Sequence, residues 1–158
     1  MHLKADHMEQ LDLVMEIFKE MQERGFFPTT ITWNYVVEAF CDKDNLPKAP
    51  KIIHVIQQTG CVPNSYTYDL LIDGYCKESR MSEALDLLYN LNSGRGFVPR
   101  MKTYNALTKG LCTIGNSKNA NCLLQQIHQR GLKPSLYIYT ILIETHLQKG
   151  GIVKDNVE

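Results

Sequence analysis

The chain has 158 residues, of which 44% are hydrophobic and 22% charged, and its 17 basic side chains balance its 17 acidic ones. This length suits one domain, and the composition is that of a folded chain. The apolar runs are shorter than the roughly 20 residues that a membrane span needs. Five cysteines without a C-x-x-C pair argue against a disulfide framework or a four-thiolate zinc site. We therefore expect no membrane segment, no metal and no cofactor.

The charge is unevenly distributed along the chain. Residues 1–86 carry 8 basic and 14 acidic side chains, residues 87–143 carry 7 basic and none acidic, and residues 144–158 carry 2 and 3. The central run is a basic field that an anionic partner would feel, unless it is only a solvated face. Acidic residues recur through residues 1–23, whereas targeting presequences are rich in arginine, so we expect no transit peptide in this chain.

The strongest signal is an internal repeat. Three kinds of residue recur at intervals of 35, 36 and 35 residues: prolines at Pro28, Pro63, Pro99 and Pro134, glycines at Gly25, Gly60, Gly96 and Gly131, and aromatic residues at Trp33, Tyr68, Tyr104 and Tyr139. We divide the chain accordingly into a partial repeat (1–29), three complete repeats (30–64, 65–100 and 101–135) and a second partial repeat (136–158). The middle complete repeat has one extra residue, near positions 93–96.

Each complete repeat predicts two helices. The first helix of the repeat at 30–64 has apolar residues at helical spacing, Trp33, Val36, Val37 and Phe40, but Pro50 predicts that its second helix begins late. Both helices of the repeat at 65–100 are regular, with Tyr68, Leu71, Ile72 and Tyr75 followed by Ala84, Leu87, Leu88 and Leu91. The repeat at 101–135 follows the same plan with Tyr104, Leu107, Thr108 and Leu111 and then Ala120, Leu123, Leu124 and Ile127.

The small residues Ala39, Gly74 and Gly110 recur in the first helices, where we expect close helix crossings. A single helical hairpin cannot bury its own apolar face, so neighbouring repeats must stack. We predict an all-α fold, an α-solenoid of helix-turn-helix repeats.

The repeat resembles the pentatricopeptide repeat. Its units open with Thr32-Trp33-Asn34, Thr67-Tyr68-Asp69 and Thr103-Tyr104-Asn105, and close with a glycine, two residues, a proline and a polar residue. The resemblance covers nearly the whole chain and is to the P-type, plant organellar form of the family. It implies a right-handed superhelix that belongs to a longer array, works in a mitochondrion or plastid, and binds single-stranded RNA with one base per repeat.

The resemblance also implies which residues contact RNA. The fifth residue of a repeat and its last residue would read the base, here Asn34 with Asn64, Asp69 with Arg100, Asn105 with Ser135, and Thr140 in the last partial repeat. The second residues would stack on bases, here Ile31, Tyr66, Lys102 and Tyr137, and Lys77 and Lys102 would meet phosphates. By the same resemblance Asn34 with Asn64 suggests a pyrimidine, and Asn105 with Ser135 suggests cytosine over uracil. Asp69 with Arg100 suggests no particular base.

Other readings of these residues remain open. Asn64 and Ser135 precede predicted helices, where capping alone would favour them, and Asn34 or Asn105 could be solvated. The cysteines at Cys41, Cys76 and Cys112 share one position of the repeat, so we expect a row of helix-face residues instead of a metal cluster. We find no nucleophile, base and orienting group at workable spacing and predict no enzyme. The alternatives to RNA binding are a protein-interaction scaffold of tetratricopeptide type or a nonfunctional remnant, and exposed apolar ends predict self-association.

Overall fold

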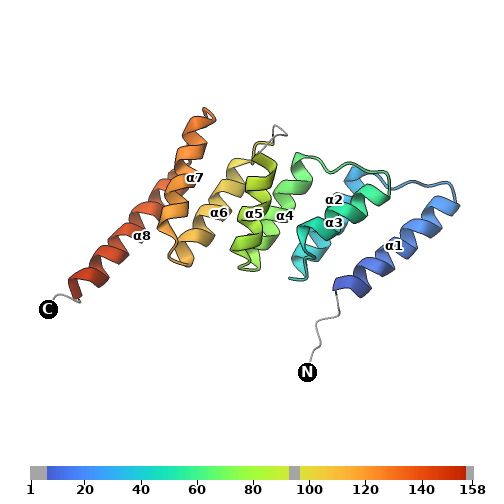
Figure 1. Ribbon diagram of the computed structural model, residues 1–158, viewed down its shortest axis with the longest axis horizontal. Coiled ribbons are helices and arrows are strands. Elements are labelled where there is room, and N and C mark those ends of the chain that lie inside the picture. Colours follow the sequence, from blue (N-terminus) through green and yellow to red (C-terminus); the bar gives the residue numbers. More distant parts are fainter. Residues whose placement is uncertain (1–6, 93–96, 156–158) are drawn as a thin grey trace, which may run out of the picture. The chain divides into compact units, whose positions relative to one another are not determined.

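The computed structural model describes residues 7–92 and 97–155 (Figure 1). The chain divides into two compact units, residues 1–97 and 98–158. All secondary structure in the described ranges is helical, which confirms the all-α class. None of the described helices is both long and apolar enough to cross a membrane. Unit 1 contains α1 (His7–Glu23), α2 (Thr30–Asp42), α3 (Ala49–Gln58), α4 (Ser65–Lys77) and α5 (Met81–Asn92), and unit 2 contains α6 (Met101–Thr113), α7 (Ser117–Gln129) and α8 (Leu136–Asp155).

Polar side chains determine where several helices begin. Thr29 precedes α2 and Asn64 precedes α4, and each accepts a hydrogen bond from the backbone amide three residues later. In both cases the threonine at that third position, Thr32 or Thr67, accepts in return from the amide of the cap residue. These reciprocal bonds satisfy amides that would otherwise lack partners, at about 1 kcal/mol for each cap.

Glycines follow the ends of two second helices. Gly60 after α3 has φ +78°, and Gly131 after α7 has φ +70°. This left-handed conformation ends a helix at little cost only in a residue without a side chain. Gly96, at the same position of the middle repeat, and the extra residue near it lie outside the described residues.

The core of unit 1 consists of the apolar positions expected from the repeat. Trp33 is fully buried, its ring contacts Phe18 of α1 edge to face at 4.9 Å, and its Nε1 donates to Thr59 Oγ1 at 2.8 Å. α2 packs against α4, and α4 against α5. The four predicted apolar residues of α4, Tyr68, Leu71, Ile72 and Tyr75, are all buried, and Tyr68 meets Phe97 edge to face at 5.7 Å.

The late start of α3 is confirmed. Ala49 is the twentieth residue of its repeat, whereas α5 and α7 begin at the seventeenth residue, Met81 and Ser117. Pro50 therefore lies in the first turn of α3, where its missing amide hydrogen has no partner to lose.

The close helix crossing is present at Gly74 but not at Ala39. A β-carbon on Gly74 would lie 2.5 Å from Cys41 Sγ and 2.9 Å from Leu46 Cδ2, so only glycine lets α4 approach α2 this closely. Ala39 is exposed, so the prediction of a close crossing there was wrong. The reason is that α4 packs against α2 on a face that does not include Ala39.

Unit 2 repeats the same arrangement with three helices. α6 packs against α7 and α8, and α7 also packs against α8. Its buried residues include those predicted for α6 and most of those predicted for α7, together with two from α8: Tyr104, Leu107, Thr108, Leu111, Ala120, Leu123, Ile127, Ile138 and Leu142. Each unit thus sets a first helix against the first helix of the following repeat, α2 against α4 and α6 against α8.

Candidate nucleic-acid interface

In unit 1 the packing of α2 on α4 brings Asn34 and Asn64 to a shared partner. Thr67 Oγ1 lies 2.6 Å from Asn34 Oδ1 and 2.9 Å from Asn64 Oδ1. Asn34 is only 7% exposed, whereas Asn64 is exposed. We call Asn34 and Asn64 the first polar pair, and Thr67 its bridge. The fifth and last residues of this repeat, 30 positions apart, are therefore neighbours in space.

In unit 2 the corresponding residues meet without a bridge. Ser135 Oγ donates to Asn105 Oδ1 at 2.8 Å and accepts from the backbone amide of Ile138 at 3.3 Å. Both Asn105 and Ser135 are half-buried. We call them the second polar pair. Capping and pairing are thus not alternatives here, because Ser135 does both, as Asn64 does in unit 1.

The other predicted base-reading residues differ in exposure. Asp69 of α4 is 1% exposed, and Arg100, the residue before α6, is exposed. Asp69 belongs to unit 1 and Arg100 to unit 2. Thr140 is exposed, and its hydroxyl donates to the carbonyl of Leu136 at 2.9 Å, within α8.

The predicted stacking and phosphate positions all lie at the surface. Ile31 is 66% exposed, and Tyr66 and Tyr137 are each 42% exposed. Lys77 and Lys102 are exposed as well. An exposed apolar or aromatic side chain one turn before a polar pair can cover a base face at about 1–3 kcal/mol for each base.

The charge beside the polar positions changes along the chain. The residue four positions after each fifth residue lies on the same helix face. In α2 and α4 these residues are Glu38 and Asp73, in α6 it is Lys109, and in α8 it is Glu144. Lys102 and Lys109 therefore stand on either side of Asn105, one turn away, and both are exposed. Of these positions, the face of α6 is the one that would attract a phosphate backbone.

The cysteines do not form a reactive or metal-binding site. Burial raises the pKa of the Cys41 thiol, with a further increase from Glu78, and burial raises that of Cys76, each to about 12. Cys41 Sγ contacts the carbonyl of Leu70 at 3.6 Å, and Cys61 Sγ that of Pro28 at 3.1 Å. Burial favours the protonated thiols of Cys41 and Cys76, which act as small packing residues. The side chains that the structure describes include no cluster of three metal-ligating groups.

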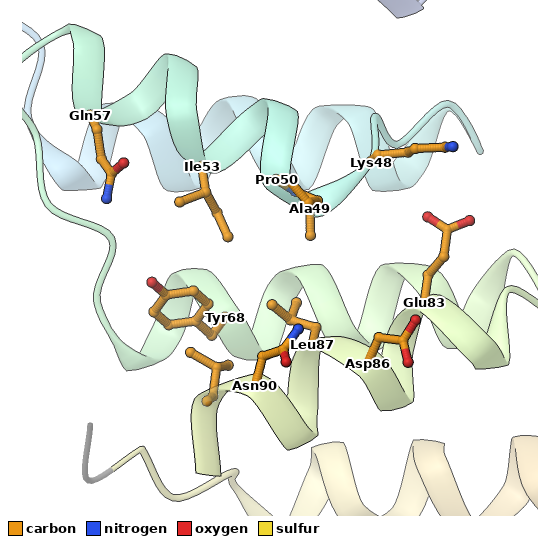
Figure 2. A pocket seen from close by; sticks show the side chains of 11 residues that line it. Lys48, Ala49, Pro50, Ile53, Gln57, Tyr68, Glu83, Asp86, Leu87 and Asn90 are labelled. Atoms are coloured by element: carbon orange, nitrogen blue, oxygen red, sulfur yellow. The ribbon is translucent and has the colours of Figure 1, made fainter. Parts of the chain in front are cut away.

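A separate cavity of about 630 Å³ lies between α3 and α5 (Figure 2). Pro50 and Ile53 of α3 face Leu87 of α5 across it, and Tyr68 of α4 lies between the two helices. No residue of either polar pair lines the cavity, so it is distinct from the candidate interface.

Thr67 is the participant that sequence reasoning missed as a site residue. It belongs to the opening tripeptide of the repeat, where Thr32, Thr67 and Thr103 recur and Ile138 replaces the threonine in the last repeat. That recurrence is visible in the sequence, where it marks the repeat and does not by itself indicate a hydrogen-bond partner for Asn34. The bridge depends on the spacing of α2 and α4, which periodicity does not give.

Comparison with known protein families decides what the repeats are. The pentatricopeptide repeat domain matches residues 4–43 and 87–148, which is more than half of the chain. The PPR repeat family matches residues 28–77, and the PPR repeat matches residues 66–93. The chain belongs to the pentatricopeptide repeat family. Its two polar pairs therefore lie at matching positions of repeats of one family.

Two pentatricopeptide repeat proteins of Arabidopsis thaliana are similar to this chain, each at 26% identity. The first is described as chloroplastic and matches 94% of this chain but 19% of its own length. The second matches 90% of this chain and 20% of its own length. The chain thus spans about a fifth of the length of these pentatricopeptide repeat relatives.

Solved structures show the same fold. The pentatricopeptide repeat protein PPR10, in complex with an 18-nucleotide psaJ RNA element, matches 88% of this chain and 20% of its own, with a TM-score of 0.66 at 23% identity. Nuclear proteinaceous RNase P 2 of Arabidopsis thaliana matches 85% of this chain and 29% of its own, with a TM-score of 0.67 at 19% identity. The pentatricopeptide α-solenoid class predicted from the sequence is confirmed.

Proposed function

We propose that this chain binds single-stranded RNA, with each complete repeat contacting one base. The observation that carries the proposal is the pairing of fifth and last residues: Asn34 with Asn64 through Thr67, and Asn105 with Ser135 directly. The first pair supplies two amides and the second an amide and a hydroxyl, and each lies beside an exposed second residue of a repeat that would cover a base face. The likeness to PPR10, which was crystallised with RNA, supports this use of the fold.

The proposed contacts are those expected from the sequence. Asn34, Asn64, Asp69, Arg100, Asn105, Ser135 and Thr140 would read base edges, Ile31, Tyr66, Lys102 and Tyr137 would cover base faces, and Lys77 and Lys102 would meet phosphates. The two polar pairs would prefer pyrimidines. Because acidic residues follow Asn34 and Asp69 by one turn while Lys109 follows Asn105, we place the strongest binding at the repeat of residues 101–135.

The proposed role is binding, without catalysis. A short bound stretch of RNA would be protected or presented to other factors, in an organelle. The chloroplastic relative supports the plastid over the mitochondrion.

Titration of short oligo-C, oligo-U and oligo-A RNAs at low and moderate salt tests the proposal. We expect the pyrimidine oligomers to bind more tightly, and the Asn105→Ala, Ser135→Ala double variant to lose about tenfold in affinity. Asn121→Ala, an exposed asparagine on the second helix α7, is the control and should bind as the unmodified chain does. Absence of RNA binding even at low salt would instead favour a protein-interaction scaffold or a remnant without function.

We also propose that the chain self-associates through its exposed apolar faces. Leu13 and Ile17 of α1 are 54% and 63% exposed, and Ile143 and Leu147 of α8 are 60% and 69% exposed. Such clustered apolar side chains favour association. Sedimentation should show oligomers at micromolar concentration and fewer of them for Ile17→Ser, and a monodisperse monomer would contradict the proposal.

A further inference from the structure

The Thr67 hydroxyl stands at the centre of the first polar pair. It is fully buried, accepts from the backbone amide of Asn64 at 3.1 Å, and lies within reach of two side-chain oxygens, Asn34 Oδ1 and Asn64 Oδ1. A hydroxyl has one proton to donate, so it can serve only one of these oxygens fully. The choice determines which atoms of the asparagines remain for a ligand.

The distances decide the choice. The separation of 2.6 Å between Thr67 Oγ1 and Asn34 Oδ1 is typical of an O–H···O bond and too short for an N–H···O bond. The proton therefore points to Asn34, and the Asn34 amide presents its oxygen to Thr67. Asn64 Oδ1 is served separately, by the backbone amide of Thr67 at 3.0 Å. Each amide oxygen consequently accepts one hydrogen bond within unit 1.

The two amide nitrogens remain available. Neither Asn34 Nδ2 nor Asn64 Nδ2 has a hydrogen-bond partner among the residues that the structure describes. Asn34 Nδ2 is not fully buried, so it reaches solvent even though Asn34 as a whole is only 7% exposed. Asn34 thus turns its oxygen toward Thr67 and its amide nitrogen, a hydrogen-bond donor, outward.

We infer that Thr67 is a positioning residue for base selection: its hydroxyl holds Asn34 Oδ1, so the Asn34 amide nitrogen faces outward as a donor and favours cytosine over uracil at this repeat. This inference rests on the proposed RNA binding. At the N3 position of its pairing edge cytosine carries an acceptor, which Asn34 Nδ2 can meet. Uracil carries an N–H at N3, and that donor would face the Asn34 donor.

Unit 2 shows what the pair looks like without such a bridge. Ile138 occupies the place of Thr67, and Ser135 itself donates to Asn105 Oδ1. The amide nitrogen of Asn105 is then the remaining donor of that pair. In unit 1 the last residue caps α4 with Asn64 Oδ1, which cannot donate, and the hydroxyl of Thr67 donates to Asn34 Oδ1 instead.

Thr67→Val removes the hydroxyl with almost no change in shape. Thr108→Val is the matched control: Thr108 is also fully buried, its hydroxyl bonds only to the carbonyl of Tyr104 in its own helix, and the same position holds Val37 and Ile72 in the other repeats. The ratio of oligo-C to oligo-U affinity should fall about fivefold in Thr67→Val and stay unchanged in Thr108→Val. Thr67→Ser keeps the hydroxyl and should restore the ratio. Thr67→Ala serves in place of valine if valine unfolds the chain.

A second measurement needs no RNA. The side-chain amide signals of Asn34 in a nitrogen–proton correlation spectrum should shift, and exchange faster with water, in Thr67→Val but not in Thr108→Val. An unchanged affinity ratio in a variant that still binds RNA, or unchanged Asn34 signals, overturns the inference. If the unmodified chain binds no RNA, the proposed function fails, and the spectra alone decide whether Thr67 positions Asn34.

Discussion

In both polar pairs a hydroxyl donates to the amide oxygen of the fifth residue, but a different residue supplies the hydroxyl. The difference follows from the last residue of the repeat. In unit 2, Ser135 caps α8 and donates to Asn105 with the same oxygen. In unit 1, Asn64 caps α4 with an oxygen that cannot donate, so a third residue, Thr67, supplies the proton for Asn34. The fifth and last residues are therefore neighbours in both repeats, but the hydroxyl that donates to the fifth residue belongs to the last residue in unit 2 and to the following repeat in unit 1.

The two pairs also differ in burial and in charge. Asn34 is 7% exposed with Glu38 one turn away, whereas Asn105 is half-buried with Lys109 one turn away. A buried polar group that loses its partner destabilises the fold, and a polar group near solvent affects ligands more than stability. The first pair should therefore matter more for folding and the second more for RNA binding.

Forcing α2 and α4 apart should have the largest effect, because unit 1 would lose the contact on which its polar pair depends while unit 2 would keep its own. In Gly74→Ala the new methyl group would lie 2.5 Å from Cys41 Sγ, and we expect a loss of about 1–3 kcal/mol in the free energy of unfolding despite the better helix propensity of alanine. The Thr67–Asn34 contact should be lost, while Asn105 and Ser135 in unit 2 keep theirs. Urea unfolding measures the loss.

Thr145→Ala is the control for that variant. Thr145 occupies the position of Gly74 in α8, is half-buried, and donates only to the carbonyl of Ile141 in its own helix. It should change the free energy of unfolding by about 0.5 kcal/mol or less. A Gly74→Ala chain as stable as the unmodified one would mean that α2 and α4 can separate without cost.

The same substitution should reduce stability more in the first pair and RNA affinity more in the second. Asn34→Ala removes the nearer of the two acceptors of the buried Thr67 hydroxyl and should cost about 1–2 kcal/mol of unfolding free energy. Asn105→Ala leaves Ser135 near solvent and should cost under about 1 kcal/mol, but it should weaken binding of oligo-C more than Asn34→Ala does. Thermal unfolding and RNA titration of both variants measure this. Equal stability losses would remove the distinction.

Much of this architecture could be predicted from the sequence, for reasons visible at particular residues. The spacing of Trp33, Tyr68 and Tyr104 identified the buried helix faces because burial repeats with the helix period. Pro50 predicted the late start of α3 because proline is accommodated only in a first turn. In both cases a local rule decides the outcome, and no distance between helices is needed.

What could not be predicted depends on how closely the helices approach. Gly74 and Ala39 look alike in the sequence, yet one lies against Cys41 and the other is exposed. The bridging by Thr67 likewise exists only because α4 lies close enough to α2 for its hydroxyl to reach Asn34. Membership of the family identified Asn34 and Asn64 as a pair, but the direction of the proton between them is a matter of tenths of an ångström.

The salt dependence of RNA affinity tests the charge difference between the two pairs. Lys109→Gln should reduce the slope of the logarithm of RNA affinity against the logarithm of salt concentration by about 0.7, the value for one phosphate contact on a single strand. At low salt this corresponds to about a fivefold loss of affinity. Lys118→Gln, an exposed lysine on the second helix α7, is the control and should leave the slope unchanged. Equal changes in both variants would indicate that only the overall charge matters.

Alkaline pH offers the mildest way to weaken unit 1. Burial raises the pKa of the Cys41 thiol from about 9 to about 12, so the unfolded chain releases this proton at a lower pH than the folded chain. The contribution of Cys41 is therefore complete below pH 9 and declines between pH 9 and 12, by about 1 kcal/mol or less at pH 9.5. Cys41→Ala should lose less stability than the unmodified chain between pH 7.5 and pH 9.5, as measured by urea unfolding. Because burial also raises the pKa of Cys76 to about 12, Cys76→Ala should show the same reduced dependence. If both variants kept the full pH dependence, ionisation of these two thiols would not be the cause of the stability loss at high pH.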